Sequence, residues 1–201
     1  DFAYIRHIPG TVVMAPKDEN EMRHMLKTAI DHDGPISLRY PRGEGEGVEM
    51  PAQGTPLEIG KGRVVREGSK VAILSLGARL EEAKKAADQL EAKGLSTTVA
   101  DMRFVKPLDE ALVLELAETH DLLVTLEENV IAGGAGIAVT EFLNARQVSM
   151  PVLQLGLPDA FVEHGQHKEL LRDCGLDAEG ILRSIATRME QLGYPTVVAA
   201  K

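Results

Sequence analysis

The sequence predicts an α/β protein in which short buried strands alternate with amphipathic helices. Apolar runs of strand length recur along the chain, stretches with a helical apolar period lie between them, and glycine or proline stands at most junctions. This alternation is typical of doubly wound parallel sheets. We therefore expect the end of one α/β domain, followed by a second, complete doubly wound α/β domain.

The bulk composition is that of a globular protein. The chain has 201 residues, of which 44% are hydrophobic and 26% charged, with a net charge of −9. This charge argues against general binding to nucleic acid or to an anionic membrane, and no apolar run has the length of a membrane span. The single cysteine, Cys174, excludes an intrachain disulfide, and we expect a buried structural thiol rather than a nucleophile. Low cysteine use fits a reducing compartment.

The first 43 residues predict a strand–helix–strand unit. Residues 11–15 read as a strand, and Asp18 followed by Glu21 is a capping-box pattern that opens a helix. The apolar positions of this helix share one face, which we expect to be core: Met22, Met25, Leu26, Ala29 and Ile30. Residues 36–38 form the second strand, which is expected to be parallel to the first. One such unit cannot form a domain, and the chain opens at Asp1 without an initiator methionine, so we expect it to continue a longer polypeptide.

A change of composition separates this unit from the rest. Residues 44–60 contain a glycine–glutamate stretch expected to be flexible and a stiffer, proline-containing stretch. We expect residues 1–43 to end one domain, 44–60 to be a linker and 61–201 to be the second domain.

The second domain contains most of the predicted elements. After an edge strand within 60–68, the expected strands cover residues 71–77, 96–100, 121–126 and 151–157. Helices are expected at about 79–93, after Asp109, after Gly136, at 166–174 and at 178–192. The last helix is expected to turn these side chains inward: Ile181, Ile185, Met189 and Leu192.

Arg42 is the candidate ligand-binding residue. It follows a short strand and Pro41, which fixes its own φ and ends the strand rigidly. A guanidinium held in this way suits a phosphate or carboxylate, because its planar fork of donors matches two oxygens. The alternative is a salt bridge to an acidic neighbour.

Other polar clusters leave their roles open. The glycine loop, residues 133–136, could hold a phosphate or could pack a helix start against a strand end. Glu127 and Glu128 could serve acid–base chemistry, cap the glycine loop or contact another chain. Residues 159–165 are interpreted as a polar loop that caps the following helix. The histidines, among them His24, His32, His164 and His167, lack ligand spacing, so we predict no metal site; no catalytic triad is visible.

Several motifs resemble a known family when read in order. They are Met14 to Glu21, Asp33-Gly34-Pro35, Arg39-Tyr40-Pro41-Arg42-Gly43, Arg103 to Asp109, Glu127-Glu128-Asn129 with Gly133 to Gly136, and Leu155 to Asp159 with Glu163-His164-Gly165. The ordered set is similar to the 1-deoxy-D-xylulose-5-phosphate synthase family and covers nearly the whole chain. Transketolases and the β subunits of 2-oxo-acid dehydrogenases share parts of it.

The resemblance implies a transferase that uses thiamine diphosphate and Mg²⁺. It implies condensation of pyruvate, after decarboxylation, with D-glyceraldehyde 3-phosphate, a step toward isoprenoids and thiamine, by a bacterial-type cytoplasmic homodimer. Residues 1–43 would end a pyrimidine-binding domain, and residues 61–201 would form a transketolase C-terminal-type domain. Arg42 would bind the substrate phosphate. No catalytic, cofactor-binding or metal-binding residue of the family maps onto this chain, so the piece is expected to be inactive alone.

Two alternatives stay open at this point. One is the C-terminal region of a transketolase or of a 2-oxo-acid dehydrogenase β subunit. The other is a non-catalytic dimerisation module.

Overall fold

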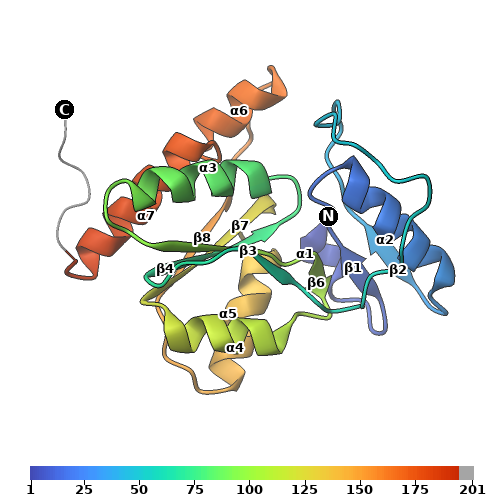
Figure 1. The fold of residues 1–201 in the computed structure, drawn as a ribbon, viewed down its shortest axis with the longest axis horizontal. Helices are drawn as coiled ribbons and strands as arrows, with labels where there is room; N and C mark the ends of the chain where they lie inside the picture. Colours follow the sequence, from blue (N-terminus) through green and yellow to red (C-terminus); the bar gives the residue numbers. More distant parts are fainter. Residues whose placement is uncertain (195–201) are drawn as a thin grey trace.

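The computed structural model describes residues 1–194, which form two sheets with helices packed on them (Figure 1). The larger sheet has the strand order β3–β5–β4–β7–β8. These strands span Arg63–Arg66 (β3), Thr97–Asp101 (β5), Val71–Leu76 (β4), Leu122–Val130 (β7) and Val152–Leu157 (β8). The last four strands in this order are parallel, and β3 runs antiparallel at the edge. The doubly wound sheet and its edge strand are confirmed.

Helices cover both faces of this sheet (Figure 1). Helices α3 (Leu80–Glu91) and α7 (Ala178–Gln191) lie on one face, with α6 (His167–Asp173) near them, and α4 (Glu110–Thr119) and α5 (Ala135–Ala145) lie on the other. Each face has its own apolar core, because β4 is buried along its whole length and its side chains alternate between the two faces. The fold therefore places the carboxyl ends of the parallel strands at one rim, beside the smaller sheet.

The smaller sheet joins the two parts of the chain. Its order is β2 (Ile36–Leu38), β1 (Val12–Met14) and β6 (Phe104–Lys106), and α2 (Glu19–Asp31) and the short α1 (Phe2–Ile5) accompany it. Strands β1 and β2 are parallel, which confirms the strand–helix–strand unit. Strand β6 was not predicted from the sequence; it comes from the second part of the chain and pairs antiparallel with β1. The backbone ladder thus continues from one part to the other.

Helix α2 begins as predicted, but its apolar face is only partly core. The Asp18 carboxylate accepts the Glu21 N–H at 2.8 Å, which confirms the cap. Met25 is fully buried, whereas Leu26 and Ile30 are 50% and 79% exposed. The core assignment of these two residues was wrong, because the small sheet under α2 covers only part of the apolar face of the helix and leaves the rest exposed.

The expected linker is tied to α2 over part of its length. The Glu19 carboxylate accepts the N–H groups of Glu46, Gly47 and Val48, and Arg23 donates to the carbonyl oxygens of Pro51 and Ala52. The segment that we expected to be flexible is therefore anchored at the helix start.

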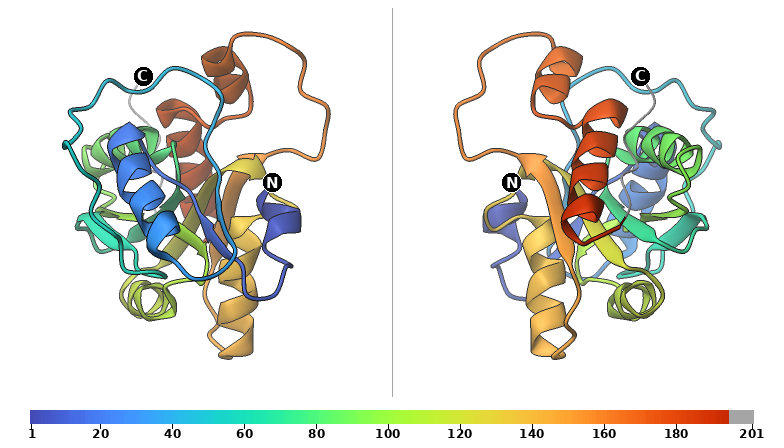
Figure 2. Two further views of the ribbon diagram at one scale, coloured as in Figure 1. Left: turned by 90° about the vertical axis from the view of Figure 1, so that its right-hand side faces the viewer. Right: turned by 90° about the vertical axis from the view of Figure 1, so that its left-hand side faces the viewer.

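Three further expectations need correction. Leu192 ends α7 as its C-cap and is 38% exposed, because the apolar stripe of the helix stops at Met189. Cys174 is the C-cap of α6 and is half-buried. Residues 159–165 do not cap α6, since its N-cap, Gln166, makes no side-chain cap hydrogen bond; this loop projects from the body (Figure 2).

No helix among the described residues is long and apolar enough to span a membrane.

Candidate functional site

The carboxyl end of β2 carries Arg42 into solvent. The backbone N–H of Arg39 still donates to the Met14 carbonyl oxygen at 2.9 Å, so the β2 ladder extends one residue past Leu38. Tyr40 and Pro41 then lead away from the sheet, and Arg42 is exposed. The salt bridge to an acidic neighbour, which was the alternative role for Arg42, is made by Arg39 instead. The Arg42 guanidinium therefore stands at a strand end, where ligands of parallel sheets gather.

A buried carboxylate lies beside this strand end. Glu128, on β7, is 5% exposed. Its Oε1 accepts a hydrogen bond from His167 Nε2 at 2.9 Å and lies 3.8 Å from Arg39 Nη2, and its Oε2 lies 3.2 Å from Arg79 Nε. The three partners come from β2, from the N-cap of α3 and from the start of α6. One carboxylate thus links three elements.

Arg39 is half-buried between this carboxylate and an aromatic ring. Its guanidinium carbon lies 5.9 Å from the Phe2 ring centroid. Burial lowers the pKa of Arg39, and the Glu128 charge opposes that shift. Because arginine stays charged even so, the strand end presents a fixed cation that needs Glu128 as its counter-charge.

Glu127 settles the choice of roles for the glycine loop. This side chain is 1% exposed, and its two oxygens accept the N–H groups of Ala135 and Gly136, each at 2.8 Å. Burial raises the pKa of Glu127, and these two hydrogen bonds oppose the rise. The carboxylate occupies the donors that a phosphate would need, so the loop packs and caps a helix start. Glu127 and Glu128 lie on successive positions of β7, point to opposite faces and do not form a dyad.

A second charged cluster joins the two parts of the chain. The Glu21 Oε1 atom lies 2.9 Å from Arg103 Nε and 3.4 Å from Arg63 Nη2, and Asp101 Oδ2 lies 3.2 Å from Arg63 Nη2. Burial and the Glu21 charge raise the pKa of Asp101 to about 7. A cavity of about 360 Å³ lies beside this cluster, lined by Lys17, Asn20, Glu21, His24, Thr55, Leu57, Arg63 and Arg103. The two carboxylates offset the two guanidiniums, so the cluster is an internal ion network.

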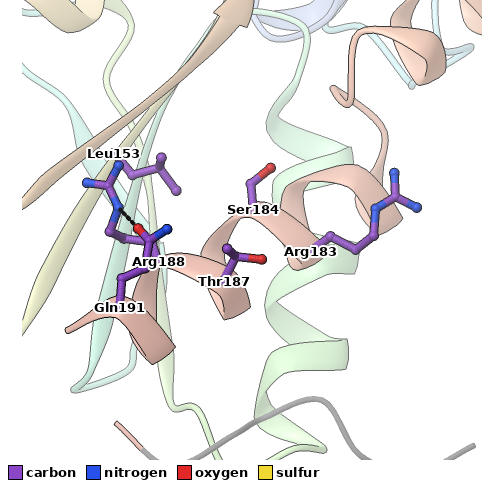
Figure 3. Close-up of a pocket in the computed structure, with 6 residues that line it drawn as sticks. All are labelled: Leu153, Arg183, Ser184, Thr187, Arg188 and Gln191. Atoms are coloured by element: carbon purple, nitrogen blue, oxygen red, sulfur yellow. Dashed lines mark hydrogen bonds between the residues drawn. The ribbon is translucent and has the colours of Figure 1, made fainter. Parts of the chain in front are cut away.

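Another cavity, of about 400 Å³, lies between β8 and α7 (Figure 3). Its lining is Leu153, Arg183, Ser184, Thr187, Arg188 and Gln191, and Arg188 Nε donates to Gln191 Oε1 at 3.2 Å. Helix α7 lies across the molecule from β2 (Figure 1), so this cavity is separate from the Arg42 strand end.

The described residues do not fit a metal-bound diphosphate. The N–H groups at the start of α5 are taken by Glu127, and within residues 1–194 no group of three His, Cys, Asp or Glu side chains is placed to hold a metal ion. His24 and His167, both weighed as ligands, bind the Thr55 backbone and Glu128 instead.

Sequence reasoning proposed Arg42 but did not predict the charged residues around its strand end. Arg79 and His167 are far from Arg42 in the chain and meet Glu128 only through the fold. The one available signal was position: Glu128 lies near the carboxyl end of the buried strand β7, and ligands of parallel sheets gather at that edge.

These features define the class of the protein. Residues 60–181 match the model of the transketolase C-terminal domain, and residues 1–46 match that of the transketolase pyrimidine-binding domain. The chain belongs to the transketolase family.

Curated relatives give a finer comparison. The chain is 58% identical over 186 residues to 1-deoxy-D-xylulose-5-phosphate synthase of Vibrio parahaemolyticus, which covers 92% of this chain and 29% of the relative. It is 55% identical over 193 residues to the synthase of the same name from Pseudomonas putida, covering 96% of this chain and 30% of the relative. The chain thus spans about 30% of the length of these relatives.

Solved structures agree on the fold. A split-gene transketolase, described as an inactive β4 tetramer, superposes with a TM-score of 0.83 at 33% identity and covers 94% of this chain and 60% of its own. The transketolase of Campylobacter jejuni superposes with a TM-score of 0.67 at 18% identity, over 90% of this chain and 27% of its own, and supports the fold alone.

Proposed function

We propose that the chain is the C-terminal part of a 1-deoxy-D-xylulose-5-phosphate synthase. In the complete enzyme, pyruvate is decarboxylated and condensed with D-glyceraldehyde 3-phosphate. The observation that supports this most is the identity of 58% over 92% of the chain, together with a coverage of only 29% of the relative. In this proposal, residues 1–43 form the end of a pyrimidine-binding domain, residues 44–60 form the linker, and residues 61–201 form the C-terminal domain.

Arg42 is the substrate-binding residue of this proposal. Its exposure at a stiffened strand end leaves the guanidinium available to the phosphate of D-glyceraldehyde 3-phosphate. An arginine–phosphate contact is worth on the order of a few kcal/mol, so its loss corresponds to roughly tenfold to a thousandfold in affinity.

The test is Arg42→Ala in the complete enzyme. We expect the KM for D-glyceraldehyde 3-phosphate to rise strongly while the KM for pyruvate stays near that of the parent. The matched control is Arg146→Ala, which removes an exposed arginine whose partner is Glu110 on the neighbouring helix. Equal, small changes in both KM values would refute the role of Arg42.

The cofactor belongs to the complete enzyme. We propose that thiamine diphosphate and Mg²⁺ are held by residues outside this chain, that the enzyme is a cytoplasmic homodimer, and that residues 1–201 alone do not turn over. Calorimetric titration of the isolated chain with thiamine diphosphate and Mg²⁺ is expected to give no heat of tight binding. A saturable, tight isotherm would contradict this assignment.

One alternative has support of its own. The similarity to a split-gene transketolase, at a TM-score of 0.83, favours a chain that is encoded separately and assembles with a second polypeptide. The intact mass of the native protein separates the two proposals. A mass several times that of the 21.7 kDa chain supports the fused enzyme, and a mass near it supports a separate subunit.

A further inference from the structure

The Glu128 carboxylate lies where the two parts of the chain meet. It belongs to β7 of the larger sheet, whereas Arg39 belongs to the strand end of the smaller sheet. The side chain of Glu128 is 6% exposed and that of Arg39 is 19% exposed, so both charges are largely shielded from solvent. A contact of this kind is screened far less than a surface pair.

Two further side chains, one of them a guanidinium, hold Glu128 in place. His167 Nε2 lies 2.9 Å from Oε1, and Arg79 Nε lies 3.2 Å from Oε2. Neither Arg79 Nε nor Glu128 Oε2 has an aligned hydrogen-bond partner among the described residues, so the Arg79 contact is mainly coulombic. The carboxylate is therefore anchored on its own sheet and can orient a group that approaches from the other one.

Arg39 precedes Arg42 at the same strand end. The Arg39 backbone is the last to bond to β1, through its N–H and the Met14 carbonyl oxygen. Only Tyr40 and Pro41 separate it from Arg42, and the fixed φ of proline restricts the path between them. The backbone path from Arg39 to Arg42 is therefore short and restricted.

We propose that Glu128 is a positioning residue that sets the direction of Arg42 through Arg39, and so contributes to recognition of the substrate phosphate. This inference rests on the proposed function. Without the Glu128 charge, Arg39 and Arg79 repel each other at a half-buried site, with only the more weakly acting Glu127 as an opposite charge on Arg39. Arg39 then turns toward solvent and takes the strand end with it.

The test uses Glu128→Gln in the complete enzyme, with D-glyceraldehyde 3-phosphate compared with unphosphorylated D-glyceraldehyde. Glutamine keeps the size of the side chain and a hydrogen bond to His167 but removes the charge. We expect the KM for the phosphorylated aldehyde to rise roughly tenfold, with kcat and the KM for pyruvate within about twofold of the parent. The preference in kcat/KM for the phosphorylated aldehyde falls by the same factor, and inhibition by inorganic phosphate weakens.

A double-mutant cycle separates positioning from general destabilisation. Arg39→Gln breaks the same contact from the other side, so the double variant is expected to lose no more phosphate preference than either single variant. Independent structural damage would give additive losses. If Glu128→Gln does not fold, Arg39→Gln alone carries the test, because it leaves Glu128 paired with Arg79 and His167. Glu110→Gln, an exposed first-turn glutamate paired with Arg146, is the matched control.

The outcomes distinguish this inference from the function on which it rests. Loss of phosphate preference in Arg42→Ala, in Glu128→Gln and in Arg39→Gln supports both. Loss in Arg42→Ala alone overturns the positioning role and leaves the proposed function standing. An unchanged preference in Arg42→Ala overturns the phosphate role of Arg42, and with it the positioning role.

Discussion

The cap that Glu127 provides for α5 should be a measurable part of the stability of the fold. The substitution Glu127→Gln keeps the shape of the side chain, but one of its two acceptors becomes an amide donor. That donor then faces a backbone N–H, of either Ala135 or Gly136. We therefore expect the start of α5 to loosen from β7.

The magnitude follows from three contributions. One charge-assisted hydrogen bond is lost, worth about 1.5–3 kcal/mol, and a buried N–H is left without an acceptor, which costs about 1–3 kcal/mol. In the opposite direction, glutamine is uncharged, so the variant avoids the free-energy cost of burying a charge, the same burial that raises the pKa of Glu127. The net destabilisation expected is about 2 kcal/mol, or a fall of about 1 M in the urea midpoint for a slope of about 2 kcal/mol per M.

Urea denaturation followed by circular dichroism measures the total loss of stability. Hydrogen exchange at the Ala135 and Gly136 amides shows whether that loss is local to the start of α5. Glu110→Gln makes the same change in the first turn of α4, at an exposed ion pair, and should shift stability by about 0.5 kcal/mol or less. If Glu127→Gln is no less stable than Glu110→Gln, or if the two amides keep their protection, the capping role is refuted.

Three further outcomes are expected. Asp101 has a folded pKa of about 7, above its unfolded value, so its contribution to stability falls as the pH rises from about 4 to 7. Asp101→Asn should remove this pH dependence of the unfolding free energy, whose slope is at most about 1.4 kcal/mol per pH unit. An unchanged slope in the variant would count against the role of Asp101. Glu19→Gln should expose residues 44–50 to proteolysis. Backbone hydrogen bonds, first from Glu19 itself and then from Gly47, lower the pKa of Glu19, so the parent should be cleaved likewise as the pH falls through that pKa; equal cleavage rates of the parent and the variant would be contrary evidence. Gly136→Ala places a Cβ in a clash with Thr125 Oγ1, and 3.2 Å from Thr125 Cβ and 3.3 Å from Glu127 Oε1. It should cost about 1–3 kcal/mol in urea denaturation, whereas a variant as stable as the parent would show that the start of α5 shifts without cost.

Local patterns predicted the strands and helices because their signals are short-range. Asp18 caps α2 and Asp109 caps α4, and each accepts an N–H three residues ahead, as the sequence suggested. Strand β6 escaped prediction because it has three residues and ends before Pro107, so its pairing with β1 depends on tertiary contact.

The site was harder to predict because its residues meet only in the fold. Arg42 could be proposed from a proline and a strand end nearby, but the partners of Glu128 come from segments separated by dozens of positions. The exposed Leu26 shows the same limit for packing, since helical periodicity reports an apolar face and not the width of the surface that meets it.

The junction between the two parts of the chain combines a backbone ladder with charged contacts. Strand β6 pairs with β1, Glu128 meets Arg39, and Glu21 meets Arg63 and Arg103. Buried ion pairs add little net stability compared with apolar packing, but a mismatched orientation leaves a charge buried and unpaired at a cost of several kcal/mol. Such contacts therefore act mainly on orientation. An arginine that must meet a phosphate with two parallel hydrogen bonds needs a defined direction more than it needs a stronger core. The charged junction beside the Arg42 strand end is consistent with that requirement.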